Sequence, residues 1–71
     1  MANNRALEML RTSAEADRAK ALLSLNLLIE KGVGIGDHST GDYYKNLEEA
    51  LALLDDADGR LETLNRYFPN Q

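Results

Sequence analysis

The sequence predicts an all-α fold, an antiparallel two-helix hairpin that dimerises into a four-helix bundle. Three features of the 71 residues lead to this prediction: two long segments rich in helix-forming residues, one glycine-rich connector between them, and apolar side chains that recur at seven-residue spacing along both segments. A chain of this length makes one domain at most. We therefore expect residues 1–71 to form a single helical-hairpin domain.

The first helix is expected from about residue 4 to residue 31. Asn3 or Asn4 is an acceptable N-cap, and the segment that follows is rich in Ala, Leu, Glu, Arg and Lys, without Gly or Pro. Gly32 comes directly after it and is expected to end the helix in the left-handed conformation. Lys31 then lies favourably near the negative end of the helix dipole.

The second helix is expected from about residue 40 to residue 67, after a connector of residues 32–39. Ser39 and Asp42 have the spacing of a capping box, and Pro69 marks the end because a residue before proline disfavours the helical conformation. Gly59, inside this helix, weakens it by about 1 kcal/mol relative to alanine. Two helices of similar length with a short connector favour an antiparallel hairpin.

Each predicted helix carries an apolar stripe suited to the other helix. The stripe of the first helix is Leu7, Leu10, Ala14, Ala21, Leu25 and Leu28. The stripe of the second helix is Leu47, Ala50, Leu54, Ala57, Leu61, Leu64 and Phe68, widened by Tyr43 and Leu51. The expected pairs are Leu7 with Leu64, Leu10 with Leu61, Ala14 with Ala57, Ala21 with Ala50 and Leu28 with Tyr43. On the exposed sides we expect Arg18 near Asp55 and Arg11 near Asp58.

The first helix has more apolar surface than one hairpin can bury. Residues 22–29 are apolar around nearly the whole circumference, and a helix of that kind is normally buried on all sides. The chain has no cysteine for a disulfide, and chains of about 70 residues usually need a further source of stability. We therefore expect a homodimer; a monomer with scattered exposed leucines is the alternative. The expected interface residues are Met9, Ala16, Leu22, Leu23, Leu27, Ile29 and Leu53.

The connector holds the only residues that resemble a chemical site. Asp37, His38, Ser39 and Asp42 offer side chains for a metal ion or another ligand, but the spacing fits neither a phosphate-binding loop, which needs Lys and Ser/Thr, nor a calcium loop, which needs a glycine where Asp42 stands. A Ser39 N-cap and acidic residues at the positive end of the second helix explain the segment more simply. We therefore expect no catalytic residue, no bound metal and no cofactor.

Net charge and hydropathy limit the classes of partner that we expect this chain to bind. The formal net charge is −4, which argues against nucleic acid or an anionic membrane as a partner. No apolar run approaches the roughly 18 residues of a membrane span. Residues 1–4 lack the pattern of a signal peptide, so we expect a cytoplasmic protein.

The segment from residue 22 to residue 68 resembles small uncharacterised proteins of T-even-type tailed phages, including marine ones. The most specific part is Gly34-Ile35-Gly36-Asp37-His38, a connector between two helices. The resemblance implies a viral origin, an accessory role and the host cytoplasm as location, and it implies no catalytic residue.

Together these observations predict a non-enzymatic structural or protein-interaction protein. Its expected partners are a second copy of itself and an unidentified protein. The alternative is a ligand- or metal-binding module that uses the glycine-rich turn.

Overall fold

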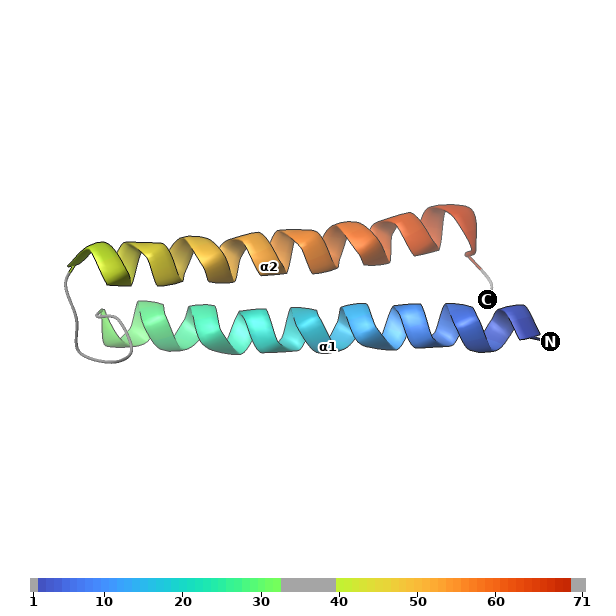
Figure 1. Cartoon of the computed structure of the whole chain (residues 1–71), viewed down its shortest axis with the longest axis horizontal. Coiled ribbons are helices and arrows are strands. Elements are labelled where there is room, and N and C mark those ends of the chain that lie inside the picture. The colour runs from blue at the N-terminus through green and yellow to red at the C-terminus, as the bar shows by residue number, and fades with distance from the viewer. Residues whose placement is uncertain (1, 33–39, 70–71) are drawn as a thin grey trace.

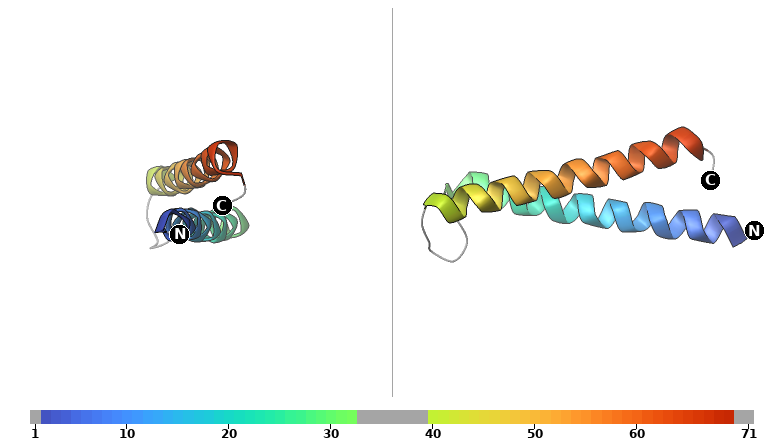
Figure 2. Two further views of the ribbon diagram at one scale, coloured as in Figure 1. Left: turned by 90° about the vertical axis from the view of Figure 1, so that its right-hand side faces the viewer. Right: turned by 45° about the horizontal axis from the view of Figure 1, so that its top comes forward.

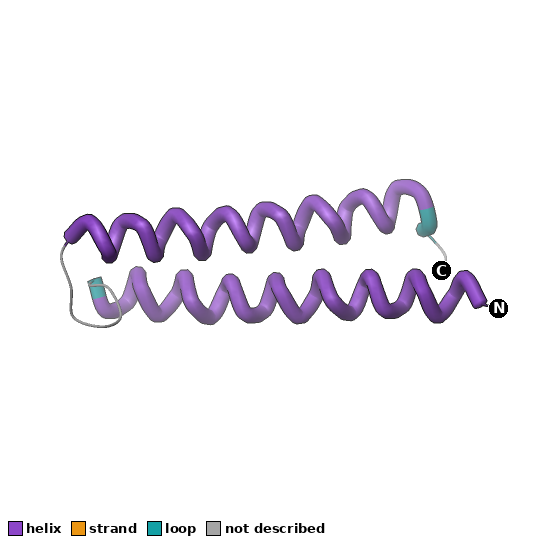
Figure 3. Tube along the Cα trace, in the orientation of Figure 1, coloured by secondary structure: helices purple, strands orange, loops and turns teal. Residues whose placement is uncertain are grey.

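The computed structural model describes residues 2–32 and 40–69, and in these ranges it contains two helices and no strand (Figure 1). Helix α1 comprises Ala2–Lys31 and helix α2 comprises Thr40–Tyr67. The helices run side by side in opposite directions, so that both chain ends lie at the same end of the molecule (Figures 1 and 3). The fold is an all-helical hairpin.

The hairpin is long and thin. Its principal dimensions are 50 × 17 × 15 Å and its radius of gyration is 15.4 Å, whereas a compact domain of this length has a radius of about 11 Å. Seen from two further directions, the helices cross at a small angle, and within residues 2–32 and 40–69 no third layer covers them (Figure 2). Each helix therefore has one neighbour and leaves most of its circumference open.

The ends of the helices follow from local sequence. Gly32 has a φ of 70°, and its N–H donates a hydrogen bond of 2.9 Å to the carbonyl of Leu28. This is the left-handed C-terminal cap expected for a glycine in that position, so that expectation is confirmed. At the other end, the N–H of Phe68 donates to the carbonyl of Leu64 at 2.8 Å, and Pro69 follows.

The core is a narrow seam of leucine and alanine between the two helices. Its members in α1 lie exactly one heptad apart in sequence: Leu7, Ala14, Ala21 and Leu28. Its members in α2 are Ala50, Ala57, Leu61 and Leu64. Ala14, Ala21 and Ala57 are 0% exposed, which indicates that the helices approach closely where the small side chains meet. Among the residues with described side chains, no polar or charged residue is buried.

The burial pattern supports the expected register of the two helices. Both members of the expected pairs Leu7/Leu64, Ala14/Ala57 and Ala21/Ala50 are buried, in separate layers of the seam. The expected pair Leu28/Tyr43 is joined directly, because the Tyr43 hydroxyl donates a hydrogen bond of 3.2 Å to the carbonyl of Leu28.

Several details differ from the expectation. Phe68 and Leu51, expected in the apolar stripe of the second helix, are 44% and 57% exposed. Leu10 is 47% exposed although its expected partner Leu61 is buried. Arg18 lies near Asp58 rather than Asp55. Arg11 donates a hydrogen bond to Asn65 rather than pairing with Asp58.

The polar differences have a geometric cause. Cβ atoms point toward the N-terminus of their own helix, so in an antiparallel pair the side chains at the edges meet partners offset along the axis.

In the described ranges, neither helix combines the length and the apolar character needed to span a membrane.

Candidate functional site

The residues of the glycine-rich turn fall mostly outside the described part of the chain. Asp37, His38 and Ser39 lie outside the described residues, so their proposed ligand or metal site is not placed. Asp42 is exposed in the first turn of α2, where its carboxylate is favourable next to the positive end of the helix dipole.

Acidic residues of α2 are engaged by arginines. The carboxylate of Asp56 is 3.0 Å from the guanidinium of Arg60, and that of Glu62 is 3.7 Å from Arg66. Within residues 2–32 and 40–69, no group of three or more His, Cys, Asp or Glu side chains is arranged to hold a metal ion.

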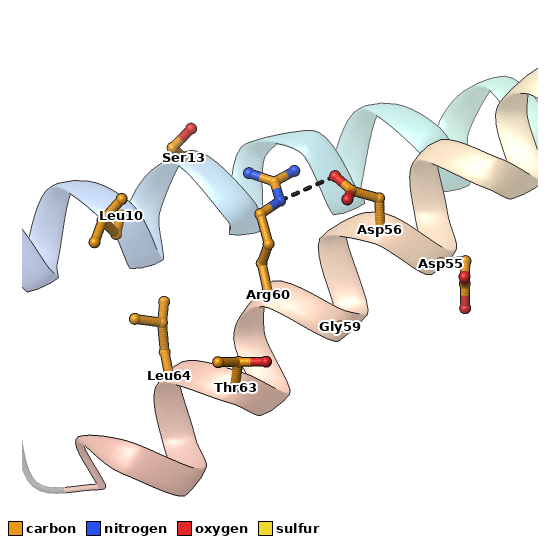
Figure 4. A pocket seen from close by; sticks show the side chains of 8 residues that line it. All are labelled: Leu10, Ser13, Asp55, Asp56, Gly59, Arg60, Thr63 and Leu64. Carbon is orange, nitrogen blue, oxygen red and sulfur yellow. Dashed lines mark hydrogen bonds and ion pairs between the residues drawn. The ribbon is translucent and has the colours of Figure 1, made fainter.

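An open groove of about 550 Å³ lies between the helices near the chain ends. Leu10 and Ser13 of α1 face Arg60 and its neighbours on α2 across this groove (Figure 4). The Arg60 guanidinium donates hydrogen bonds to Asp17 at 2.7 Å and to Asp56 at 3.0 Å. The hydrogen bond to Asp17 raises the pKa of Arg60 above its ordinary value, so the two carboxylates stabilise the charged form of this arginine.

The expected interface residues surround α1 instead of sharing one face. Met9, Ala16, Leu22, Leu23, Leu27 and Ile29 are exposed, and Leu53 is half-buried. At about 100° per residue, the row of Met9, Ala16 and Leu23 lies behind α1, on the side away from α2. Leu22 and Ile29 lie on one edge of the hairpin, and Leu27 lies toward the other. One flat partner cannot cover all of them.

One edge of the hairpin is marked by two contacts between the helices. The Arg11 guanidinium donates a hydrogen bond of 2.7 Å to the side-chain oxygen of Asn65, and Arg18 lies 4.0 Å from the carboxylate of Asp58. In each helix the two residues are seven positions apart and therefore belong to one longitudinal row. The rows run beside each other along this edge, which we call the Arg18 edge.

Both rows become apolar toward the connector. Seven residues after Arg18 comes Leu25 in α1, and seven residues before Asp58 comes Leu51 in α2, followed by Tyr44 after a further seven. Tyr44 and Leu51 are more than half exposed. The edge therefore changes from charged near the chain ends to apolar near the connector.

A third row, on the outer side of the same edge of α1, changes in the same way. Its members at seven-residue spacing are Glu8, Glu15, Leu22 and Ile29. Next to the core on α2, Leu47 and Leu54 are half-buried and complete the apolar surface. We call this surface the connector-half patch. It consists of Leu22, Leu25 and Ile29 of α1 with Tyr44, Leu47, Leu51 and Leu54 of α2.

The opposite edge is mostly polar in the half near the connector. Asp17 of α1 is joined there to Arg60 of α2, and the seven-residue row of Asp17 continues to Ser24 and Lys31. Near the connector the apolar residues by this edge are Leu27 and Leu53. Near the chain ends they are Leu10, seven residues before Asp17, and Tyr67, seven residues after Arg60, and both are exposed. The two edges therefore differ in the half of the hairpin near the connector.

The sequence expectation included Leu22 and Ile29 of the connector-half patch but assigned most of its other members to the core seam. The seven-residue rows of α1 and α2 carry the signal that identifies the patch, once the cross-helix contacts show which rows are neighbours.

Searches of family models, curated proteins and solved structures find no match to this chain.

Proposed function

We propose that this protein is a non-enzymatic structural or protein-interaction protein that acts as a homo-oligomeric helical bundle, in the simplest case a homodimer of two hairpins. The observation that carries the proposal is the large apolar surface that the single hairpin leaves exposed. Contiguous apolar surface of this kind on a soluble chain is typical of an interaction site.

The total surface supports this proposal. The chain exposes 5386 Å², whereas about 4,400 Å² is expected for a compact monomer of its mass. The excess of roughly 1,000 Å² is close to the roughly 800 Å² that each partner buries in a standard protein interface. One further hairpin is therefore enough to bring the exposed surface near the ordinary range.

The small core gives a second reason. Among the residues with described side chains, half of the eight buried core side chains are alanines, and alanine contributes little apolar area to burial. The chain also has no cysteine to form a disulfide. Association of two hairpins adds buried apolar surface and stabilises the folded chain by mass action.

Sedimentation equilibrium of the purified protein, from micromolar to millimolar concentration, tests the proposal. We expect a species of twice the 7.9 kDa chain mass, together with a melting temperature that rises with protein concentration. A chain that sediments at its single mass throughout, with a melting temperature independent of concentration, contradicts it.

A further inference from the structure

The Arg18 edge offers one apolar surface that is contiguous across both helices. The contacts Arg11–Asn65 and Arg18–Asp58 align the rows of the two helices. The same alignment brings Leu25 of α1 beside the Leu51 row of α2. A partner that lies on this edge therefore contacts both helices at once.

We propose that the connector-half patch is the surface that binds a second copy of this chain, patch against patch. The inference rests on the proposed function, because it assigns the interface of the proposed homodimer. The contact is isologous: the same residues of both copies take part.

The area favours a second copy as the occupant. A two-fold interface removes the same patch from water on both chains. The excess surface of the whole chain, roughly 1,000 Å², is of the size that one partner covers in a standard dimer interface. A second hairpin also supplies the two missing neighbours of a four-helix bundle, one for each helix.

The charges limit where that second copy lies. Beyond the patch, the Arg18 edge carries Glu8, Glu15, Arg11, Arg18 and Asp58 in its terminal half. A partner placed head to tail with full overlap sets its apolar patch on these charges and removes them from water, which is costly. Overlap of the two connector halves avoids that cost and covers apolar side chains with apolar side chains.

The structure supplies a matched pair of variants for the test. Leu51 of the patch is 57% exposed, and Leu23, behind α1, is 63% exposed. Both are leucines in the body of a helix, so Leu51→Glu and Leu23→Glu place the same charge at equally exposed positions on different faces. Circular dichroism is expected to show an equal helix content for both variants and the wild type.

Sedimentation equilibrium of the variants then shows which face of the hairpin forms the dimer contact. We expect Leu51→Glu to raise the dissociation constant of the dimer by at least roughly tenfold, because each dimer would bury two unpaired charges. Leu23→Glu is expected to dimerise as the wild type does. Leu51→Ala, which keeps a strong helix former, is expected to weaken the dimer in the same direction but less.

The outcomes distinguish the two proposals. A monomeric wild-type chain overturns the proposed function, and the interface assignment with it. A dimeric wild-type chain with an unaffected Leu51→Glu variant overturns the interface assignment alone. Loss of the dimer in Leu23→Glu, with Leu51→Glu unchanged, instead assigns the interface to the face behind α1.

Discussion

The two halves of the hairpin share one core but differ along the Arg18 edge. In the half near the chain ends, Arg11 and Arg18 cross to polar partners on α2. In the half near the connector, the same rows present Leu25 and Leu51. The buried seam between the helices runs through both halves without such a change.

This difference separates the residues that close the hairpin from the residues that we propose bind a second copy. The leucine and alanine seam, from Leu7 to Leu28 in α1, has buried members in both halves of the hairpin. The edge residues contribute little to closing the hairpin because they remain exposed or half-exposed. In the proposed dimer, their chemistry instead sets which half would bind the second copy and which half would remain exposed to water.

The largest expected effect concerns the shared core. Leu28→Ala, near the connector, and Leu64→Ala, near the chain ends, each remove a buried leucine and are expected to cost about 2–4 kcal/mol of unfolding free energy. Because the seam is continuous, we expect the two costs to be similar when measured by urea unfolding at one protein concentration.

A large inequality between these two variants contradicts a continuous seam. If Leu64→Ala costs almost nothing while Leu28→Ala unfolds the chain, then only the connector half is held together in solution, and the difference between the halves extends into the core.

A smaller effect is expected for the polar ties between the helices. Tyr43→Phe removes the part-buried hydrogen bond to the carbonyl of Leu28 and is expected to cost about 1 kcal/mol. Arg11→Gln removes an exposed hydrogen bond to Asn65 and is expected to lie within about 0.5 kcal/mol of the wild type. Urea unfolding of both variants measures the two losses of unfolding free energy. A loss for Arg11→Gln that equals or exceeds the loss for Tyr43→Phe contradicts the account.

The smallest expected effect is a gain in stability. Gly59 has open space where a Cβ would be added, so Gly59→Ala is expected to stabilise the protein by about 0.5–1 kcal/mol through helix propensity. Ala52, seven residues earlier and also exposed, provides the reciprocal control. Ala52→Gly is expected to lose about as much as Gly59→Ala gains, as measured by thermal unfolding.

If instead Gly59→Ala destabilises the protein or weakens its dimer, a partner lies close to that glycine. The interface then includes the half near the chain ends, and the comparison between the halves fails.

Much of the fold follows from the sequence. The seven-residue spacing of Ala14 and Ala21 in one helix and Ala50 and Ala57 in the other identifies the seam, and Gly32 identifies the end of α1. These features depend on local conformation and on the period of a helix, which the chain carries in its own sequence.

The connector-half patch spans both helices, so the pattern of one helix alone does not locate it. Leu51 belongs to the widened apolar stripe of α2 in the sequence, and the structure places it on an exposed edge next to the row of Arg18 and Leu25. The side of α1 on which that row lies is fixed by the register and by the lean of side chains along both axes. Periodicity within a single helix does not contain this information.

The most direct test of the account is a search for contacts between chains in a dimer formed from ¹³C-labelled and unlabelled protein. Isotope-filtered nuclear Overhauser spectra of such a sample report only methyl groups that touch the other chain. The account predicts intermolecular contacts at Leu22, Ile29 and Leu51. Contacts confined to Met9 and Leu23, behind α1, contradict it.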